Sequence, residues 1–150
     1  MGPMLSRLPI VLAALLVSAA ACAGGPAPTP TPSDMSAVLA ALALRGATLH
    51  QAVSGDAGCP GSGLHSNAAR LELSTDDGED KLVYLFRWRR AADFAAAGER
   101  FAECVREFEA ATGIEAVIVE ASPWRAYGPG WSEAFVESVA DSLRAAGGGT

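Results

Sequence analysis

The sequence predicts one α+β domain of two layers, in which a mixed sheet of about four strands carries helices mainly on one face. Three observations predict this class. Two segments of alternating apolar residues flank an acidic turn, a longer segment places apolar residues at helical spacing, and a run of branched apolar residues follows that helix. The expected order is α-β-β-β-α-β-α, with a right-handed crossover in the β-α-β portion.

The domain is expected to begin with a helix and a short strand. The helix is predicted over residues 34–44, and Gly46 stops it. Its apolar positions fall at helical spacing and are Met35, Val38, Leu39 and Leu42. Residues 48–53 are predicted as a strand. A loop is predicted over residues 55–63, because four glycines and a proline interrupt regular structure there.

The clearest predicted unit is a hairpin. Apolar and polar residues alternate over residues 69–74, and the acidic segment 76–80 turns the chain into a strand over residues 81–88. One face of that strand carries Leu82, Tyr84, Phe86 and Trp88. Val83 and Leu85 make its other face apolar as well, so we expect a central strand that is covered on part of both faces.

The second half of the domain is expected to contain two helices and one strand. The longer helix covers residues 91–112 and ends at Gly113, with Cys104 at the margin of its apolar stripe. That stripe consists of Phe94, Phe101, Val105 and Phe108. Residues 114–121 are the fourth predicted strand, and residues 132–146 form the last helix.

The N-terminal segment has the form of a secretory signal peptide over residues 1–21. One cation precedes an apolar run at positions 8–17, and small residues follow it. The run is about half the length of a membrane-spanning helix, which needs about 20 apolar residues. Ala19 to Ala21, followed by Cys22, resemble the lipobox of bacterial lipoproteins, in which the cysteine thiol receives a diacylglyceryl group. The usual large aliphatic residue three positions before the cysteine is replaced by Ala19, and ordinary secretion is the alternative.

The lipobox resemblance implies a lipid-anchored protein on the extracytoplasmic face of the cell membrane. Residues 22–32 would then be the lipidated cysteine and a Pro/Thr-rich tether, and residues 33–150 the domain. Alternating prolines favour an extended tether that could hold the domain about 30 Å from a bilayer, at about 3.1 Å per residue. The expected partner is the membrane, through acyl chains on Cys22.

Three cysteines are present in the chain. If Cys22 carries lipid, Cys59 and Cys104 remain as an even pair, for which a disulfide is the expected state in an oxidising compartment. A reactive thiol or a metal pair is the alternative for these two cysteines. No histidine or further cysteine stands at ligand spacing, so we predict no metal site and no cofactor.

The charge of the chain excludes nucleic acid as the expected partner. Its formal net charge is −6, from 17 acidic and 11 basic residues, and becomes −7 when a signal peptide carrying one arginine is removed (10 − 17 = −7). Such a balance also argues against a polybasic membrane-binding face.

The best candidate for a binding site is the segment 122–131, predicted as a loop after a strand end. It combines three aromatic residues and a cation that could grip a glycan, a peptide or an acyl group. The candidate residues are Trp124, Arg125, Tyr127 and Trp131. The alternative interpretation is that the two tryptophans cap the core.

Other polar groups have structural explanations. The acidic turn at residues 76–80 could hold calcium but is typical of a solvated hairpin tip. Acidic residues at positions 133, 137 and 141 recur every four residues, as on an outward helical face. His50 or His65 could act as a base beside a serine, yet no nucleophile motif accompanies either residue. We therefore predict no catalytic residue.

Two functions remain open for the domain. The first is a non-catalytic binding or interaction module that contacts an envelope protein or a small ligand. The second is a small exported hydrolase that uses His50 or His65. The β-α-β-α half of the domain, in which Tyr84 to Phe86 open into a charged helix and Val117 to Val119 follow, resembles small exported domains of uncharacterised bacterial lipoproteins, a likeness of pattern that implies no activity.

Overall fold

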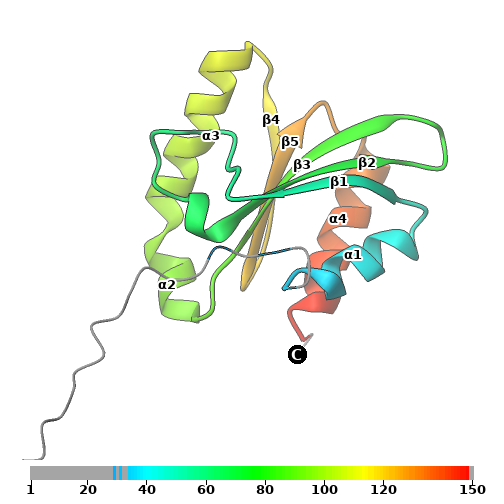
Figure 1. Ribbon diagram of the computed structural model, residues 1–150, viewed down its shortest axis with the longest axis horizontal. Coiled ribbons are helices and arrows are strands. Elements are labelled where there is room, and N and C mark those ends of the chain that lie inside the picture. Colours follow the sequence, from blue (N-terminus) through cyan, green and yellow to red (C-terminus); the bar gives the residue numbers. More distant parts are fainter. Residues whose placement is uncertain (1–28, 30, 32–33, 149–150) are drawn as a thin grey trace, which may run out of the picture.

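The computed structural model describes Thr29, Thr31 and residues 34–148. The predicted signal peptide, Cys22 and the rest of the tether lie outside the described residues. The elements in chain order are α1 (Ser36–Ala43), β1 (Thr48–Ser54), a 3-10 turn η1 (His65–Asn67), β2 (Ala68–Ser74), β3 (Asp80–Arg87), α2 (Ala91–Ala96), α3 (Gly98–Thr112), β4 (Ala116–Ala121), β5 (Trp124–Pro129) and α4 (Glu133–Ala146) (Figure 1).

The α+β class is confirmed, but the sheet differs from the prediction. It has five strands in the order β1-β2-β3-β5-β4, and every neighbouring pair is antiparallel. The predicted mixed sheet of four strands is therefore wrong. The predicted hairpin is present as β2 and β3, in which Leu71 pairs with Val83.

The fifth strand explains the change in topology. β5 occupies the segment that the sequence predicts as a loop, and it pairs with β3 on one side and with β4 on the other. β3 and β4 therefore run in the same direction without touching. Trp124–Pro129 escapes sequence prediction because Pro123, Gly128 and Gly130 interrupt the strand pattern.

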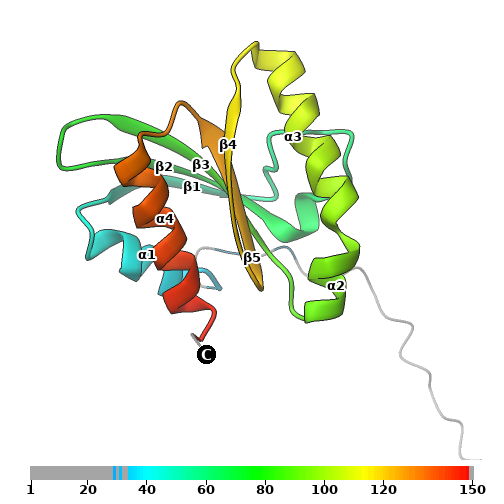
Figure 2. The ribbon, with the colours of Figure 1, turned by 180° about the vertical axis from the view of Figure 1, so that it is seen from behind.

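Helices cover both faces of the sheet, so the expectation of helices mainly on one face is wrong. α1 and α4 pack on one face, and α2 and α3 pack on the other (Figures 1 and 2). The cause lies in β3, whose two faces are both apolar. Val83 and Leu85 belong to the core beneath α1 and α4, while Tyr84 and Phe86 belong to the core beneath α2 and α3.

The long helix predicted over residues 91–112 consists of two helices, α2 and α3, with Ala97 between them. Ala97 is fully buried against the second core. The predicted end of α3 is correct: Gly113 has a φ of 71°, which glycine adopts without the steric cost of a side chain. The buried face of α3 includes Cys104, as the position of this residue beside the phenylalanine stripe predicts.

Candidate functional site

The four residues predicted to form an aromatic contact lie in or directly after β5 and are buried. Trp124 and Trp131 join the core beneath α1 and α4, and Tyr127 joins the core beneath α2 and α3. Arg125 is 5% exposed. The segment is therefore not an exposed loop, and its four side chains do not form one surface. The alternative interpretation, that the tryptophans complete the core, agrees with this burial.

Arg125 of β5 packs against α2 and links this helix to the sheet. The Cζ atom of its guanidinium lies 3.9 Å from the ring centre of Phe94 and 5.1 Å from that of Trp88, and the side chain pairs with Glu120 of β4. Cation–π contacts and one partly exposed carboxylate thus offset part of the cost of burying this charge, while Nη1 has no hydrogen-bond partner among the described residues. These contacts give Arg125 a structural role within the described residues.

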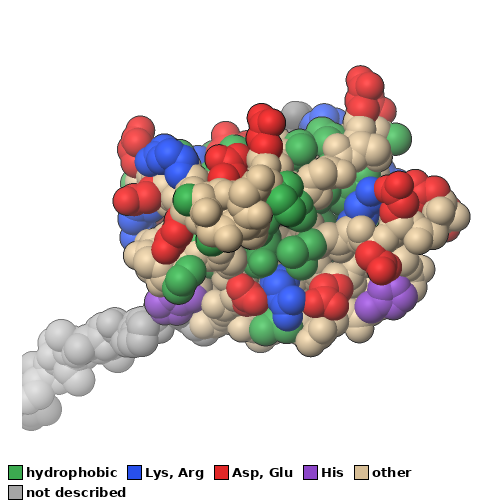
Figure 3. Space-filling view, turned by 90° about the horizontal axis from the view of Figure 1, so that it is seen from above, with side chains coloured by type: hydrophobic (Ala, Val, Ile, Leu, Met, Phe, Trp, Pro, Cys, Tyr) green, Lys and Arg blue, Asp and Glu red, His purple; other side chains and the backbone are tan. Residues whose placement is uncertain are grey.

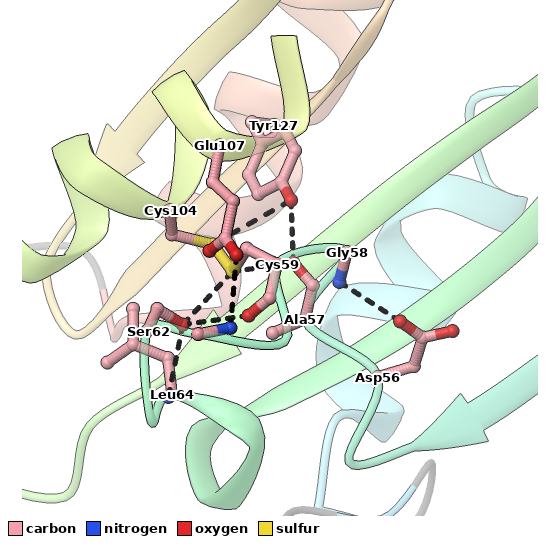
Figure 4. The surroundings of a disulfide bond; sticks show 10 residues. Asp56, Ala57, Gly58, Cys59, Ser62, Leu64, Cys104, Glu107 and Tyr127 are labelled. Atoms are coloured by element: carbon pink, nitrogen blue, oxygen red, sulfur yellow. Dashed lines mark hydrogen bonds between the residues drawn. A yellow bond between two sulfur atoms is a disulfide. The ribbon is translucent and has the colours of Figure 1, made fainter. Parts of the chain in front are cut away.

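The predicted disulfide between Cys59 and Cys104 is present and joins the glycine-rich loop to α3. Figure 4 shows its surroundings. The hydroxyl of Tyr127 donates a hydrogen bond of 2.6 Å to the backbone oxygen of Ala57. Burial, with smaller effects from Tyr84 and nearby carboxylates, raises the pKa of Tyr127 far above its ordinary value, so the phenol stays protonated and remains a donor.

Among the residues that the structure describes, no helix covers β1 and most of β2 on the α3 side of the sheet. β1 is the edge strand, and its residues are exposed or half-buried. We call this region the open sheet face and define it by residues that share one side of β1 and β2, which are Gln51, Val53, Arg70, Glu72 and Ser74. His50 stands beside them, where the register of β1 and β2 shifts between Leu49 and Gln51. An irregularity of this kind re-aims side chains at a sheet edge.

A pocket of about 500 Å³ lies at the open sheet face. Its lining is mixed in charge and includes His50, Arg70, Glu72, Leu73, Asp80, Lys81 and Leu82. The volume falls within the range of small-ligand sites, about 300–1,000 Å³. Arg70, Glu72, Asp80 and Leu82 share the open side of the sheet, whereas Leu73 belongs to the core beneath α1 and α4. The charged groups, together with Leu82, can hold a polar ligand or a peptide side chain.

Ion pairs fix Arg70 at the centre of the open sheet face. Its Nε lies 3.0 Å from an Asp56 oxygen, although not in hydrogen-bond geometry, and its Nη1 donates a 2.7 Å hydrogen bond to Glu72. Asp56 stands three residues before Cys59, and its carboxylate also accepts a hydrogen bond from the Gly58 N–H. The disulfide-linked loop thereby orients a charged group of the site.

The two histidines lie apart from each other (Figure 3). His50 Nε2 is 2.8 Å from Ser74 Oγ, in a side-chain hydrogen bond across β1 and β2. His65 belongs to η1, near the start of β2. The sequence names both histidines as candidate bases, but only the structure brings His50 to a serine.

The acidic segments agree with their structural explanations. Asp77 of the hairpin tip accepts hydrogen bonds from Thr75 and from the backbone of Glu79, and the Thr75 hydrogen bond is the main cause that lowers the pKa of Asp77. No three acidic, histidine or cysteine side chains converge to hold a metal ion within the described part of the chain. The acidic stripe of α4 is exposed, and Asp141 in it pairs with Arg144.

Comparison with known proteins finds no matching family model, no matching curated protein and no matching solved structure. Among the described residues, no helix has the length and apolar character needed to cross a membrane. The fold and the site together define a disulfide-bonded α+β domain whose open sheet face is its best candidate for a contact surface.

Proposed function

We propose that this chain is an extracytoplasmic lipoprotein, anchored to the cell membrane through acyl chains on Cys22, and that its domain is a non-catalytic binding module. The disulfide between Cys59 and Cys104 is the observation that supports it best. Disulfides persist in oxidising compartments, and this pairing leaves Cys22 as the one cysteine available for lipid. The likeness of residues 19–22 to a lipobox supports the same proposal.

The open sheet face is the proposed contact of this module. Its central cation, Arg70, is already held by Asp56 and Glu72, so little conformational entropy would be lost when a partner binds there. The expected partner is a peptide segment of an envelope protein or a small polar ligand. The pocket with Asp80 and Leu82 offers both charged and apolar contacts to such a partner.

The anchor is tested by the intact mass of the mature protein made in a lipidating bacterial host. We expect a chain that begins at Cys22 and carries acyl groups, with two hydrogens missing until the protein is reduced. A Cys22→Ser variant serves as the control and should lack the acyl mass. An unlipidated chain with free thiols would contradict both the anchor and the disulfide.

The contact is tested by photo-crosslinking in the native host. A benzophenone amino acid at Gln51, on the open sheet face, should give a discrete adduct that is weakened by Arg70→Ala. The same probe at Glu137, exposed on α4, is the matched control and should not give this adduct. Equal adducts at both positions, or an adduct indifferent to Arg70→Ala, would contradict a contact at this face.

A small exported hydrolase is the second candidate, and the hydrogen bond between His50 and Ser74 favours it. In such an enzyme His50 would accept the proton of the Ser74 hydroxyl while the Ser74 oxygen attacks a carbonyl carbon of the substrate. The proton would then pass to the leaving group, and water would release the acyl group from Ser74. Within the described residues, no hydrogen bond orients the other ring nitrogen of His50, as a catalytic triad requires.

A fluorophosphonate probe distinguishes the two candidates. A hydrolase should be labelled at Ser74, and labelling should be lost in Ser74→Ala and in His50→Ala but kept in Ser36→Ala, which changes an exposed serine on α1. A binding module should remain unlabelled and should keep its crosslinked partner in the His50→Ala variant.

A further inference from the structure

The two ends of the sheet carry opposite charge. At one end, β3 leads through Trp88 into α2, and the cations Arg87, Arg89 and Arg90 follow one another around this tryptophan. At the other end lies the tip of the β2–β3 hairpin, with Asp76, Asp77, Glu79 and Asp80. β3 separates these groups by about 23 Å, at about 3.3 Å per residue. Figure 1 shows α2 and the hairpin tip at opposite ends of β3.

The chain that precedes the domain arrives at the basic end. A Cβ built at Gly55, directly after β1, would lie 3.6 Å from the Thr29 methyl group. Thr31 donates a backbone hydrogen bond of 2.9 Å to the Asp34 carboxylate, and the Asp34 carbonyl accepts one of 3.4 Å from Arg87. The described part of the chain therefore enters the domain beside Arg87.

The three arginines differ in how far they are neutralised. Arg90 forms a two-point ion pair with Asp93, and Arg87 is half-buried beside Trp124. Arg89 is exposed, and no ion pair to it is found within the described residues. The hydrogen bonds from Thr31 are the main cause that lowers the pKa of Asp34, and burial opposes them. The charges of Arg87 and Arg89 lower this pKa further. Among the described residues, the carboxylates found to interact with these three cations are those of Asp34 and Asp93.

We propose that the surface formed by Arg87, Arg89 and Arg90 faces an anionic phospholipid bilayer when the chain is anchored through Cys22. This inference rests on the anchor of the proposed function. Three arginines are fewer than a polybasic segment that binds membranes alone, but an anchor raises the effective concentration of headgroups at this end. The tether reaches about 30 Å only when it is fully extended, and shorter separations are open to it. Within about 10 Å of the surface, attraction of the arginines and repulsion of the acidic hairpin tip would turn that tip away from the membrane.

This orientation would fix how the open sheet face of the binding module is directed relative to the membrane. The open sheet face lies along β1 and β2, between the two charged ends. In this orientation the strands rise from the membrane, and the pocket with His50 and Asp80 stands toward the distal end. A partner would therefore reach this pocket laterally, from the aqueous phase outside the bilayer.

The test imposes the anchor chemically, so that it does not depend on natural lipidation. The mature chain, with Cys22 as its one free thiol, is coupled to a maleimide lipid in vesicles that contain spin-labelled headgroups. Paramagnetic relaxation of backbone amides at residues 88–92 is compared with that at residues 76–80. On anionic vesicles we expect relaxation at least about threefold larger at the basic end, because paramagnetic relaxation falls steeply with distance from the spin labels and the two ends are about 23 Å apart along β3.

Charge reversal supplies the decisive comparison. Arg89→Glu should reduce the difference between the two ends, whereas Arg106→Glu, an equal charge change at an exposed site on α3, should leave it intact. Zwitterionic vesicles or about 0.5 M salt should reduce the difference to the value that the anchor alone produces, because salt screens exposed charges. Equal relaxation at both ends on anionic vesicles would overturn the proposal, as would a difference that is as large on zwitterionic lipid as on anionic lipid. Failure of natural lipidation would appear only in the mass of the native protein.

Discussion

Tyr127 and Ala57 are joined by a hydrogen bond of 2.6 Å between residues that stand 70 positions apart in the sequence. The phenol belongs to the central region of the sheet, and the carbonyl belongs to the loop that the disulfide holds. This bond ties the loop to the strand that sequence patterns miss. The positions of the Asp56 and Arg70 side chains at the open sheet face therefore depend on the core beneath α3.

Removing the Tyr127 hydroxyl should destabilise the domain. Tyr127→Phe leaves the Ala57 carbonyl without its donor, so we expect a loss of about 1–3 kcal/mol in the free energy of unfolding. Urea titration measures the loss. Tyr84→Phe is the matched control, because the two rings stack at 4.9 Å and burial rather than hydrogen bonding raises the pKa of Tyr84. An equal loss in both variants would show that the hydrogen bond contributes little.

Removing the disulfide should lower the free energy of unfolding, because the unfolded chain gains conformational entropy. The bridge closes a separation of 45 residues, for which the chain-entropy model gives about 3–4 kcal/mol. We expect this loss in the double variant Cys59→Ala, Cys104→Ala, measured by denaturant unfolding in a Cys22→Ser background. The single Cys22→Ser variant is the reference. Unchanged stability would mean that the loop is held by its other contacts alone.

Gly58 should be intolerant of a side chain. Its φ is +70°, and a Cβ there would lie 2.5 Å from the Tyr127 hydroxyl oxygen. Gly63 has a similar φ of +68° but open space around it, so Gly63→Ala isolates the backbone strain. We expect Gly58→Ala to cost at least about 2 kcal/mol more than Gly63→Ala in thermal or urea unfolding, because overpacking adds to strain. Similar losses would contradict the close approach of loop and tyrosine.

Asp34 should contribute to stability only at pH values above its pKa. The hydrogen bonds from Thr31 lower the pKa of this carboxyl below 3.8 in the folded protein. A depressed pKa in the folded state gives a stabilisation that is present above the unfolded value and lost as the pH falls through the folded one. Asp34→Asn should therefore destabilise the domain at pH 7, and this loss should shrink as the pH falls through the folded pKa of Asp34. A loss that does not change with pH would exclude the charged carboxylate as its cause.

Sequence patterns predict the elements with strong periodicity and miss those interrupted by special residues. The β2–β3 hairpin follows from alternating apolar positions, and Gly113 correctly marks the end of α3. β5 is missed because Gly128 and Pro129 suggest a turn. Gly128 is present for another reason, since a Cβ there would lie 2.2 Å from the Leu82 carbonyl oxygen. Close backbone approach between strands leaves no periodic signal.

The candidate site is predictable only in part. Cysteine counting predicts the pairing of Cys59 with Cys104, and the structure contains it. The open sheet face depends on which residues of β1 and β2 share a side, and the irregular register at His50 conceals this from simple alternation. The contact of His50 with Ser74 joins residues 24 positions apart, and only the folded sheet brings them together.

The position of β5 between β3 and β4 sets when the fold can be completed. Chain synthesis proceeds from the N-terminus, so β1, β2 and β3 are available early, while β4 has no neighbour until residues 124–129 follow it. A nascent or truncated chain that ends before Trp124 would leave the β3 edge of the sheet without its neighbour. An interior strand of the finished sheet is thus among the last parts of the chain to be made, and partial lengths of this chain would expose an edge on which other strands can aggregate.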